Sequence, residues 1–232
     1  VWGVSSSEFF TVGEHGTILH FNGTSCNKME SNTMLELNGI WGISATDLLA
    51  VGRNGLILHY DGKTWNAMNN GISESLYSVW GSSSSDVYTV GSKGIILHYD
   101  GNSWSKCYSA DTGLTLYSVW GNSSTDLFAV GGYWTQDNRY VGAILHSDGN
   151  MWQTVVSDTV YALFDIWGNS ASVVYAVGFY GYITHFDGTE WINIRIDQFG
   201  SSLSAIWGSS STNLYAVGES GLILQSSEIK NH

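Results

Sequence analysis

Hydrophobic positions in this chain occur in short runs that alternate apolar and small polar residues, and no stretch keeps a helical period over ten residues. In residues 75–108 the runs 76–81, 86–91, 94–99 and 103–108 read LYSVWG, DVYTVG, GIILHY and SWSKCY. Segments rich in Ser, Gly, Asp and Asn separate them. Runs of this length bounded by turn formers predict four antiparallel strands joined by tight turns.

This unit recurs along the whole chain. Trp-Gly pairs begin at Trp2, Trp41, Trp80, Trp120, Trp167 and Trp207, with spacings of 39, 39, 40, 47 and 40 residues. Four strands at a period near 40 predict an all-β fold, a β-propeller of four-stranded antiparallel blades. We expect one domain over 1–232 with six blades, near 1–39, 40–78, 79–118, 119–165, 166–205 and 206–232. The tail 227–232 (SEIKNH) has no Asp-Gly turn and no Trp, so we expect three strands in the last blade and 23 strands in the chain. Because this last blade is incomplete, a propeller of five blades is the alternative.

Two turns of the unit carry fixed residues. We expect positive φ at both glycines of the second turn, in the pairs Gly13 with Gly16, Gly52 with Gly55, Gly91 with Gly94, Gly178 with Gly181 and Gly218 with Gly221. The third turn reads FNGTSC, YDGKTW, YDGNSW, SDGNMW and FDGTEW. There we expect the Asx side chain to accept from backbone amides, with a left-handed glycine next to it. The Trp that follows should anchor the outer strand, and Cys26 replaces it in the first repeat.

The DGxxW turn resembles the Asp-box of sialidase-like (BNR) propellers, with one residue fewer between Asp and Gly. The phrase AVG..G.ILH..DG..W is similar to the repeats of photosystem II assembly factors and of bacterial exported Trp-Gly propeller proteins. The resemblance covers almost the whole chain. It implies a propeller fold and a secreted or cell-surface location, but one propeller scaffold carries many unrelated activities.

Charge narrows the classes of partner. Eight basic and 20 acidic residues give a formal net charge of −12, which argues against nucleic acids and anionic membrane surfaces as partners. No window reaches the roughly 18 apolar residues of a membrane helix, so we expect no membrane insertion. Cys26 and Cys107 occupy different places in repeats 1 and 3, so we expect no disulfide between them.

Several recurring residues suggest chemistry, but the repeat explains them. The histidines at one place of the third strand would be spread over different blades, so we expect structural roles with backbone partners and no metal: His20, His59, His98, His146 and His185. The acids before the second strand are expected to cap turns, and Val173 and Asn213 replace them in repeats 5 and 6: Glu8, Asp47, Asp86 and Asp126. The tryptophans of the first strand should pack in the core or between blades.

A sialidase-like site would need three arginines around one carboxylate. The chain has three in all: Arg53 and Arg139 in the second turns of repeats 2 and 4, and Arg195 at the end of the fourth strand of repeat 5. That placement does not predict a common pocket. We therefore expect no catalytic residues and no cofactor.

The departures from the repeat indicate where the chain binds something. Repeat 4 has GGYWTQDNRYVG at 131–142 where other repeats have a four-residue turn, and repeat 5 has two aromatic residues in the same turn. The candidate binding residues are Tyr133, Trp134, Gln136, Asp137, Asn138, Arg139, Tyr140, Phe179 and Tyr180, with Arg53 from the equivalent turn of repeat 2. Aromatic residues and Arg dominate binding hot spots. A longer hairpin packed onto its own surface would also account for the insertion.

We therefore predict a non-catalytic binding or scaffold propeller that recognises a protein or a glycan through the second turns of repeats 4 and 5. A multivalent lectin is the alternative, although its ligand-binding residues should then recur in every blade, and no exposed polar set recurs in this way. A sialidase-like glycoside hydrolase is a second alternative.

Overall fold

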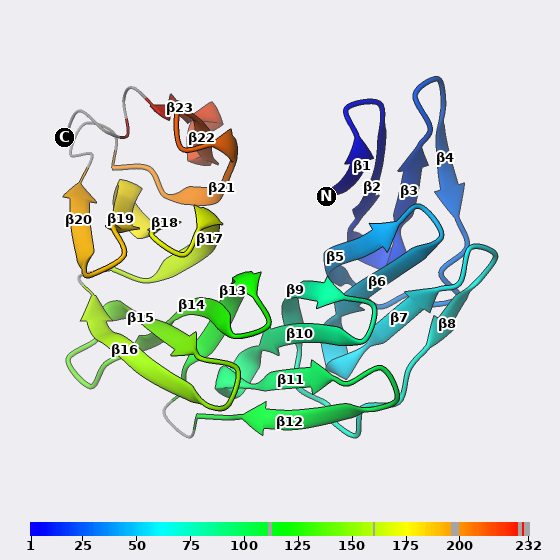
Figure 1. Cartoon of the computed structure of the whole chain (residues 1–232), viewed down its shortest axis with the longest axis horizontal. Helices are drawn as coiled ribbons and strands as arrows, with labels where there is room; N and C mark the ends of the chain where they lie inside the picture. The colour runs from blue at the N-terminus through cyan, green and yellow to red at the C-terminus, as the bar shows by residue number, and fades with distance from the viewer. Residues whose placement is uncertain (111–112, 160, 196–199, 227–228, 230–232) are drawn as a thin grey trace. The chain divides into compact units, whose positions relative to one another are not determined.

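The computed structural model of the chain describes residues 1–110, 113–159, 161–195, 200–226 and 229 (Figure 1). It contains two compact units, Val1–Ala110 and Asp111–His232. Each unit consists of three consecutive antiparallel sheets, in which the strands pair in chain order. We call these sheets blades 1 to 6 and number the strands of each blade first to fourth.

The first unit holds blades 1 to 3. Their strands are β1 (Trp2–Ser5), β2 (Glu8–Val12), β3 (Ile18–Phe21) and β4 (Cys26–Met29); β5 (Leu37–Ser44), β6 (Asp47–Gly52), β7 (Ile57–Tyr60) and β8 (Trp65–Ala67); β9 (Leu76–Ser83), β10 (Asp86–Gly91), β11 (Ile96–Tyr99) and β12 (Trp104–Tyr108). The second turns contain the short 3₁₀ segments η1 (Glu14–Gly16), η2 (Arg53–Gly55) and η3 (Ser92–Gly94).

The second unit holds blades 4 to 6. Their strands are β13 (Thr115–Ser123), β14 (Asp126–Trp134), β15 (Tyr140–Ser147) and β16 (Trp152–Thr159); β17 (Leu163–Ser170), β18 (Val173–Gly178), β19 (Tyr182–Phe186) and β20 (Trp191–Arg195); β21 (Leu203–Ser210), β22 (Asn213–Gly218) and β23 (Ile223–Gln225). The 3₁₀ segments η4 (Phe179–Gly181) and η5 (Glu219–Gly221) lie in the second turns of blades 5 and 6.

The predicted fold class is confirmed: the chain is all-β, with six propeller blades and 23 strands in the described residues. The last of these blades has three described strands, and the tail 227–232 lies outside the described residues apart from Ile229. First strands begin a few residues before the repeat boundaries that we expected, for example at Leu37 and Leu76. The alternation of apolar residues starts there, ahead of the Trp-Gly pair.

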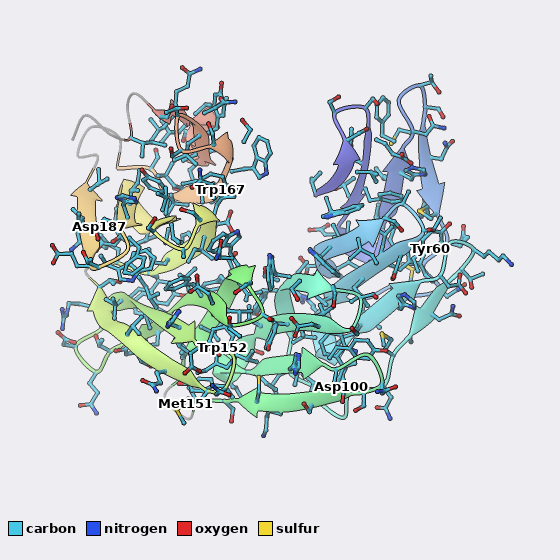
Figure 2. The ribbon with its side chains drawn as sticks, viewed as in Figure 1. Tyr60, Asp100, Met151, Trp152, Trp167 and Asp187 are labelled. Atoms are coloured by element: carbon cyan, nitrogen blue, oxygen red, sulfur yellow. The ribbon has the colours of Figure 1, made fainter. Side chains whose placement is uncertain are left out.

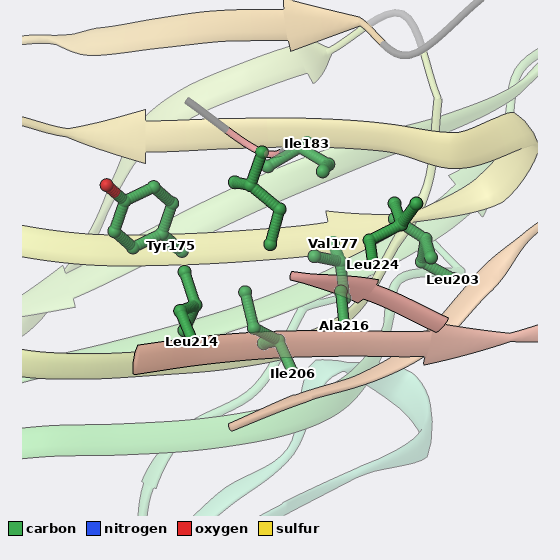
Figure 3. Packing of buried hydrophobic residues seen from close by; sticks show 9 residues of the cluster. Tyr175, Val177, Ile183, Leu203, Ile206, Leu214, Ala216 and Leu224 are labelled. Atoms are coloured by element: carbon green, nitrogen blue, oxygen red, sulfur yellow. The ribbon is translucent and has the colours of Figure 1, made fainter. Parts of the chain in front are cut away.

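Apolar side chains fill the space between consecutive blades of a unit. In the first unit, Leu49 and Ile57 of blade 2 pack with Leu97 and Trp104 of blade 3. Figure 3 shows the corresponding core of blades 5 and 6, where Tyr175 and Ile183 lie in one cluster with Leu203, Leu214 and Leu224. Each fully buried side chain of this size contributes about 1.5–3 kcal/mol. A blade therefore needs its neighbour, because its two faces have little else to cover them.

A contact between a Trp ring and a glycine determines how closely the first strands of consecutive blades approach each other. A Cβ added to Gly81 would lie 2.7 Å from Cη2 of Trp41 in the preceding blade, and one on Gly168 would lie 2.6 Å from Cη2 of Trp120. Trp167 lies against Gly208 in the same way, and Figure 2 shows it near the start of blade 6. Trp41, Trp120 and Trp167 thus pack between blades, as predicted, and a glycine on the first strand of the next blade leaves room for each ring. Trp207 differs, because its side chain is 63% exposed.

The second turns differ from our expectation. Gly16, Gly55, Gly94, Gly181 and Gly221 have positive φ, but the other glycine of each pair is extended, with φ between −161° and −174°. The residue before each positive-φ glycine is also left-handed: His15, Asn54, Lys93, Tyr180 and Ser220.

The extended glycines are required for another reason. A Cβ on Gly52, Gly91, Gly178 or Gly218 would lie 2.0–2.2 Å from a carbonyl oxygen of the segment that leads into the first strand. That carbonyl accepts from the N–H of the next turn residue, as in Arg53 N to Glu36 O at 3.0 Å. Close backbone contact, and not turn conformation, therefore selects glycine here.

The third turns form as predicted. In the turn between β11 and β12, labelled at Asp100 in Figure 2, Asp100 Oδ1 accepts from the backbone N–H groups of Asn102 and Ser103 at 2.9 and 2.8 Å. Gly101 has φ 93°. The same amide bonds lower the pKa of Asp100, and in blade 5 the Thr189 hydroxyl and the turn amides lower the pKa of Asp187 to about 2. Asn22 takes this role in blade 1.

The recurring histidines and acids form pairs, so the turn-capping and backbone-bonding roles that we expected for them are wrong. Nε2 lies 2.7–2.9 Å from a carboxylate oxygen in four blades: His20 with Glu8, His59 with Asp47, His98 with Asp86 and His146 with Asp126. His98 is the cross-strand partner of Tyr88, two residues from Asp86. Same-face neighbours on adjacent strands are within reach of each other, which brings the imidazole to the acid.

Replacing Gly81 with Ala should destabilise the protein by about 1–3 kcal/mol, the usual cost of overpacking, because its Cβ would overlap the Trp41 ring. Trp41→Phe removes the overlapping ring atoms. The double variant should therefore cost less than the sum of the two single changes in urea unfolding. Gly13→Ala, whose Cβ meets nothing within 4 Å, is the control. Additive costs for Trp41→Phe and Gly81→Ala would contradict this packing.

The third turns should make the protein sensitive to acid. Because the pKa of Asp187 falls from 3.8 to about 2 on folding, its charge stabilises the native state above about pH 4, and this contribution disappears as the pH falls to about 2. Asp187→Asn should keep the turn, as Asn22 does. The difference in unfolding free energy between wild type and Asp187→Asn should shrink between pH 5 and pH 2. A constant difference over this range would contradict the assignment.

Candidate functional site

The insertion in repeat 4 forms strands and not a loop. β14 and β15 continue past the point where the other blades turn, with Tyr133 paired to Val141 and Trp134 paired to Tyr140. The turn at the tip is confined to residues 135–139. Because successive side chains of a strand face opposite sides, Trp134 and Tyr140 share one face of this hairpin and Tyr133 has the other.

Polar contacts organise the tip of the hairpin. The Thr135 hydroxyl donates to Asp137 Oδ1 at 2.6 Å, and Arg139 Nε donates to Asp137 Oδ2 at 2.6 Å. These two donors lower the pKa of Asp137 to about 2. Asn138 takes a left-handed conformation, and its N–H donates to Thr135 O at 3.1 Å. The tip therefore has a defined shape although its side chains are exposed.

Backbone bonds connect the base of the hairpin to blade 5. Ala162 N donates to Tyr140 O at 3.2 Å, and Phe179 N donates to Ala162 O at 2.9 Å. A Cβ on Gly132 would lie 2.5 Å from Cβ of Ala162. The hairpin, the segment leading into β17 and the second turn of blade 5 are thereby held together.

Aromatic rings cover this junction as one contact network, which we call the aromatic platform. Its members are Tyr117, Trp134, Tyr140, Tyr161, Phe164, Phe179 and Tyr180. Trp134 stacks on Tyr140 with ring centroids 4.8 Å apart, and Phe179 lies 6.4 Å from Tyr140 in an edge-to-face arrangement. The hydroxyls of Tyr117 and Tyr140 are hydrogen bonded. Such ring pairs add about 0.5–1.5 kcal/mol beyond area burial, so the platform is rigid.

Two rings of the platform face solvent. Trp134 is 63% exposed and Tyr180 is 48% exposed, whereas the other members are partly buried. Tyr180 also has φ 54°, a conformation that is costly for a bulky residue. The equivalent residues in the other short turns are His15, Asn54, Lys93 and Ser220, so the repeat does not require an aromatic residue there.

Of the residues predicted as a site, Trp134, Tyr140, Phe179 and Tyr180 come together in the platform. Four others are exposed at the tip of the hairpin: Gln136, Asp137, Asn138 and Arg139. Tyr133 is partly buried on the other face of the hairpin.

Arg53 belongs to the first unit, where its Nε lies 2.6 Å from Glu36 Oε2. Our sequence analysis missed Tyr117, Tyr161 and Phe164. Tyr117 and Phe164 share a repeat position with Tyr77, which made them look like part of the regular unit.

A partly buried acid was also missed. Asp165 occupies the first-strand position of Gly39, Ser78, Ser118 and Ala205, and it is the only acid among them. Its Oδ1 accepts from the Ser118 hydroxyl of blade 4 at 2.7 Å, and its Oδ2 accepts from Ile206 N of blade 6 at 2.9 Å. Burial raises the pKa of Asp165, against the opposing effect of these bonds. One side chain thus joins the first strands of three blades.

The described residues contain no group of three His, Cys, Asp or Glu side chains that could hold a metal ion. Within that same part of the chain no helix is long and apolar enough to cross a membrane. Cys26 and Cys107 are both exposed, and neither forms a disulfide bond within the described residues.

No protein-family model matches the chain, and no curated protein does. Solved structures match its fold. YCF48 from Cyanidioschyzon merolae has a TM-score of 0.70 at 12% identity, covering 96% of this chain and 79% of that one. A chain of a nidogen–laminin complex has a TM-score of 0.64 at 12% identity, covering 96% and 90%. At these identities the matches support the β-propeller fold, and function must be argued from the site.

Asp165 allows a test of the contact between blades. Asp165→Ala removes the acceptor of the Ile206 N–H and should cost about 1–3 kcal/mol in unfolding free energy. Asp165→Asn keeps an acceptor for Ile206 and should cost less. Because folding raises the pKa of Asp165, its ionisation opposes folding as the pH rises above about 4, and the Asn variant should lose this pH-dependent decrease. Equal costs for the two variants in urea unfolding at pH 7 would contradict the role of the Ile206 bond.

Proposed function

We propose that the protein is a non-catalytic binding propeller that recognises a protein partner through the aromatic platform. The observation that carries the proposal is the exposed pair Trp134 and Tyr180 on a rigid ring network. Large aromatic side chains that are already immobilised lose little entropy on binding and make the strongest interface contacts. Gln136, Asn138 and Arg139 at the hairpin tip supply polar groups for the rim of such an interface.

The cost of the platform supports a binding role over a hairpin that only packs on its own surface. A self-packed hairpin would gain stability by covering Trp134, which is 63% exposed. Tyr180 is 48% exposed, and none of the residues at the same left-handed place in the other short second turns is Phe, Tyr or Trp. Two exposed aromatic rings on the same sector of the unit are typical of residues retained for contact with another molecule.

The lectin and glycosidase alternatives find less support. A lectin with one site per blade would repeat its ligand-binding residues, but the left-handed turn residue differs in each short second turn. For a sialidase-like site, Arg53 and Arg139 are each in an ion pair with an acid of their own blade, Glu36 and Asp137. The side chain of Arg195 lies outside the described residues.

The double variant Trp134→Ala/Tyr180→Ala tests the proposal. In affinity capture from cells that produce the protein, it should lose the proteins that wild type retains. Because the variant also loses ring contacts with Tyr140, Tyr161 and Phe179, its melting temperature should fall by several degrees, so capture is compared at a temperature at which both proteins are fully folded. Met151→Ala, at a side chain 57% exposed in a third turn of the same unit, is the matched control and should retain them.

Retention of the same proteins by wild type and the double variant would contradict the proposal. Glycan-array binding that the double variant loses would favour the glycan alternative. A stoichiometry of several glycans per chain would favour the lectin.

A further inference from the structure

The junction of blades 4 and 5 forms a cavity of about 780 Å³ that is open to solvent on one side. Blade 4 contributes Asp126, Phe128 and His146, and blade 5 contributes Thr184, Trp191 and Asn193. Its volume falls within the roughly 300–1,000 Å³ of sites for small ligands. Neither Trp134 nor Tyr180 lines it, although its wall residue Tyr182 contacts Tyr161 of the aromatic platform with ring centroids 6.0 Å apart. Most of its wall comes from the second, third and fourth strands of the two blades.

The equivalent place in other blades is filled by leucine. Thr184 is the cross-strand partner of Ala176, and the residue paired in the same way with Ala50 is Leu58. Leu97 of blade 3 has the same position. These leucines belong to buried cores that also contain Trp65 and Trp104, which are 3% and 8% exposed. Blade 5 therefore has the smaller, polar side chain of Thr184 at the position where blades 2 and 3 have a leucine.

Two buried hydroxyl groups in the cavity wall donate hydrogen bonds to the fourth strand of blade 5. The Tyr182 hydroxyl donates to Asn193 Oδ1 at 2.6 Å, and the Thr184 hydroxyl donates to Ile192 O at 3.2 Å. Tyr182 and Thr184 are 2% and 1% exposed. Burial raises the pKa of Tyr182, so its hydroxyl stays neutral and fixes the Asn193 amide. The wall is thus built and held in one arrangement.

One carboxylate oxygen of Asp126 in the cavity wall lacks a hydrogen-bond donor within the described part of the chain. Asp126 Oδ1 is 2.9 Å from His146 Nε2, but Oδ2 is buried and has no hydrogen-bond partner among the described residues. In blade 3 the corresponding oxygen of Asp86 accepts from the Ser82 hydroxyl. A buried oxygen without a donor is unfavourable, and more so when it is charged. Asp126 is therefore placed to accept a hydrogen bond from a ligand.

The cavity also selects the charge of that ligand. Glu190 adds a second carboxyl group, and the described lining residues include no Lys and no Arg. The rings of Phe128 and Trp191 lie edge to face with centroids 5.7 Å apart. A carboxylate beside aromatic faces is the environment that favours an organic cation, through a charge-assisted hydrogen bond and cation–π contact. The net charge of −12 raises the local concentration of cations further.

We infer that the cavity binds a guanidinium or ammonium group. The group donates to the carboxylate of Asp126, whose side chain is partly exposed, and lies against the partly exposed ring of Trp191. It belongs either to a small free molecule or to a basic side chain of a protein partner. Neither source depends on the aromatic platform.

Calorimetric titration of the full chain tests the inference with four probes. Butylguanidine, a single cation at neutral pH, represents the free cation, and a blocked Gly-Arg-Gly peptide represents the side chain. Butylurea and the blocked Gly-citrulline-Gly peptide are their neutral isosteres. We expect 1:1 binding of at least one cation, at least tenfold tighter than its neutral isostere, and the tighter of the two cations identifies the source. No cation binding, or equal binding of cation and isostere, would overturn the inference.

Three variants locate the site. Thr184→Leu restores the residue of the other blades and should weaken binding of the cation at least tenfold without lowering the melting temperature. Asp126→Asn should weaken it to a similar degree. Asp86→Asn disrupts the equivalent pair in blade 3 and is the matched control, so it should bind as wild type does. Wild-type affinity in Thr184→Leu would overturn the inference even if Asp126→Asn failed to fold. Trp134→Ala/Tyr180→Ala should bind the cation normally, which separates this site from the proposed function.

Discussion

The structure of each unit depends on the way one blade covers the next. A four-stranded sheet has two faces to bury, and here a Trp ring of one first strand lies against a glycine of the following first strand. The distances leave no space for a Cβ at Gly81 or Gly168. This contact fixes how closely the blades approach, and the apolar cores between them follow from it. Packing between blades therefore accounts for the recurrence of the Trp-Gly pair along the chain, and no role in catalysis or binding is required to explain it.

The same dependence explains where binding residues can be placed. Second turns are tied by backbone bonds to the segment before the first strand, so their side chains are free to vary. Blade 4 extends its second hairpin by continued strand pairing, and Ala162 links that hairpin to the second turn of blade 5. The aromatic platform thus sits on three segments that cannot move independently. Rigid support of this kind lets Trp134 and Tyr180 stay exposed without collapsing onto the surface.

Comparison among the blades also distinguishes the acids that recur for structural reasons from acids that have a role in one blade only. The pairs of His with Glu or Asp recur in four blades and serve the strand pairing. Asp126 belongs to this set, but it alone lines the large cavity that Thr184 and Asn193 make polar. Asp165 has no acidic counterpart and joins first strands of blades 4, 5 and 6. A regular scaffold makes such departures visible because every other blade is a control.

The sequence alone determined the fold class, the strands and the third turns, because alternation, Trp-Gly spacing and Asx-Gly signals are local and repeat many times. It also identified most rings of the platform, since Trp134, Tyr140, Phe179 and Tyr180 depart from the unit. Only the tertiary structure decided the rest. Strand register joined four of the five recurring histidines to an acid on the neighbouring strand. A close backbone approach and not a turn angle explained Gly52, and packing of two blades created the cavity beside Thr184. These features depend on distances between residues far apart in the chain, which no periodicity in a single sequence can express.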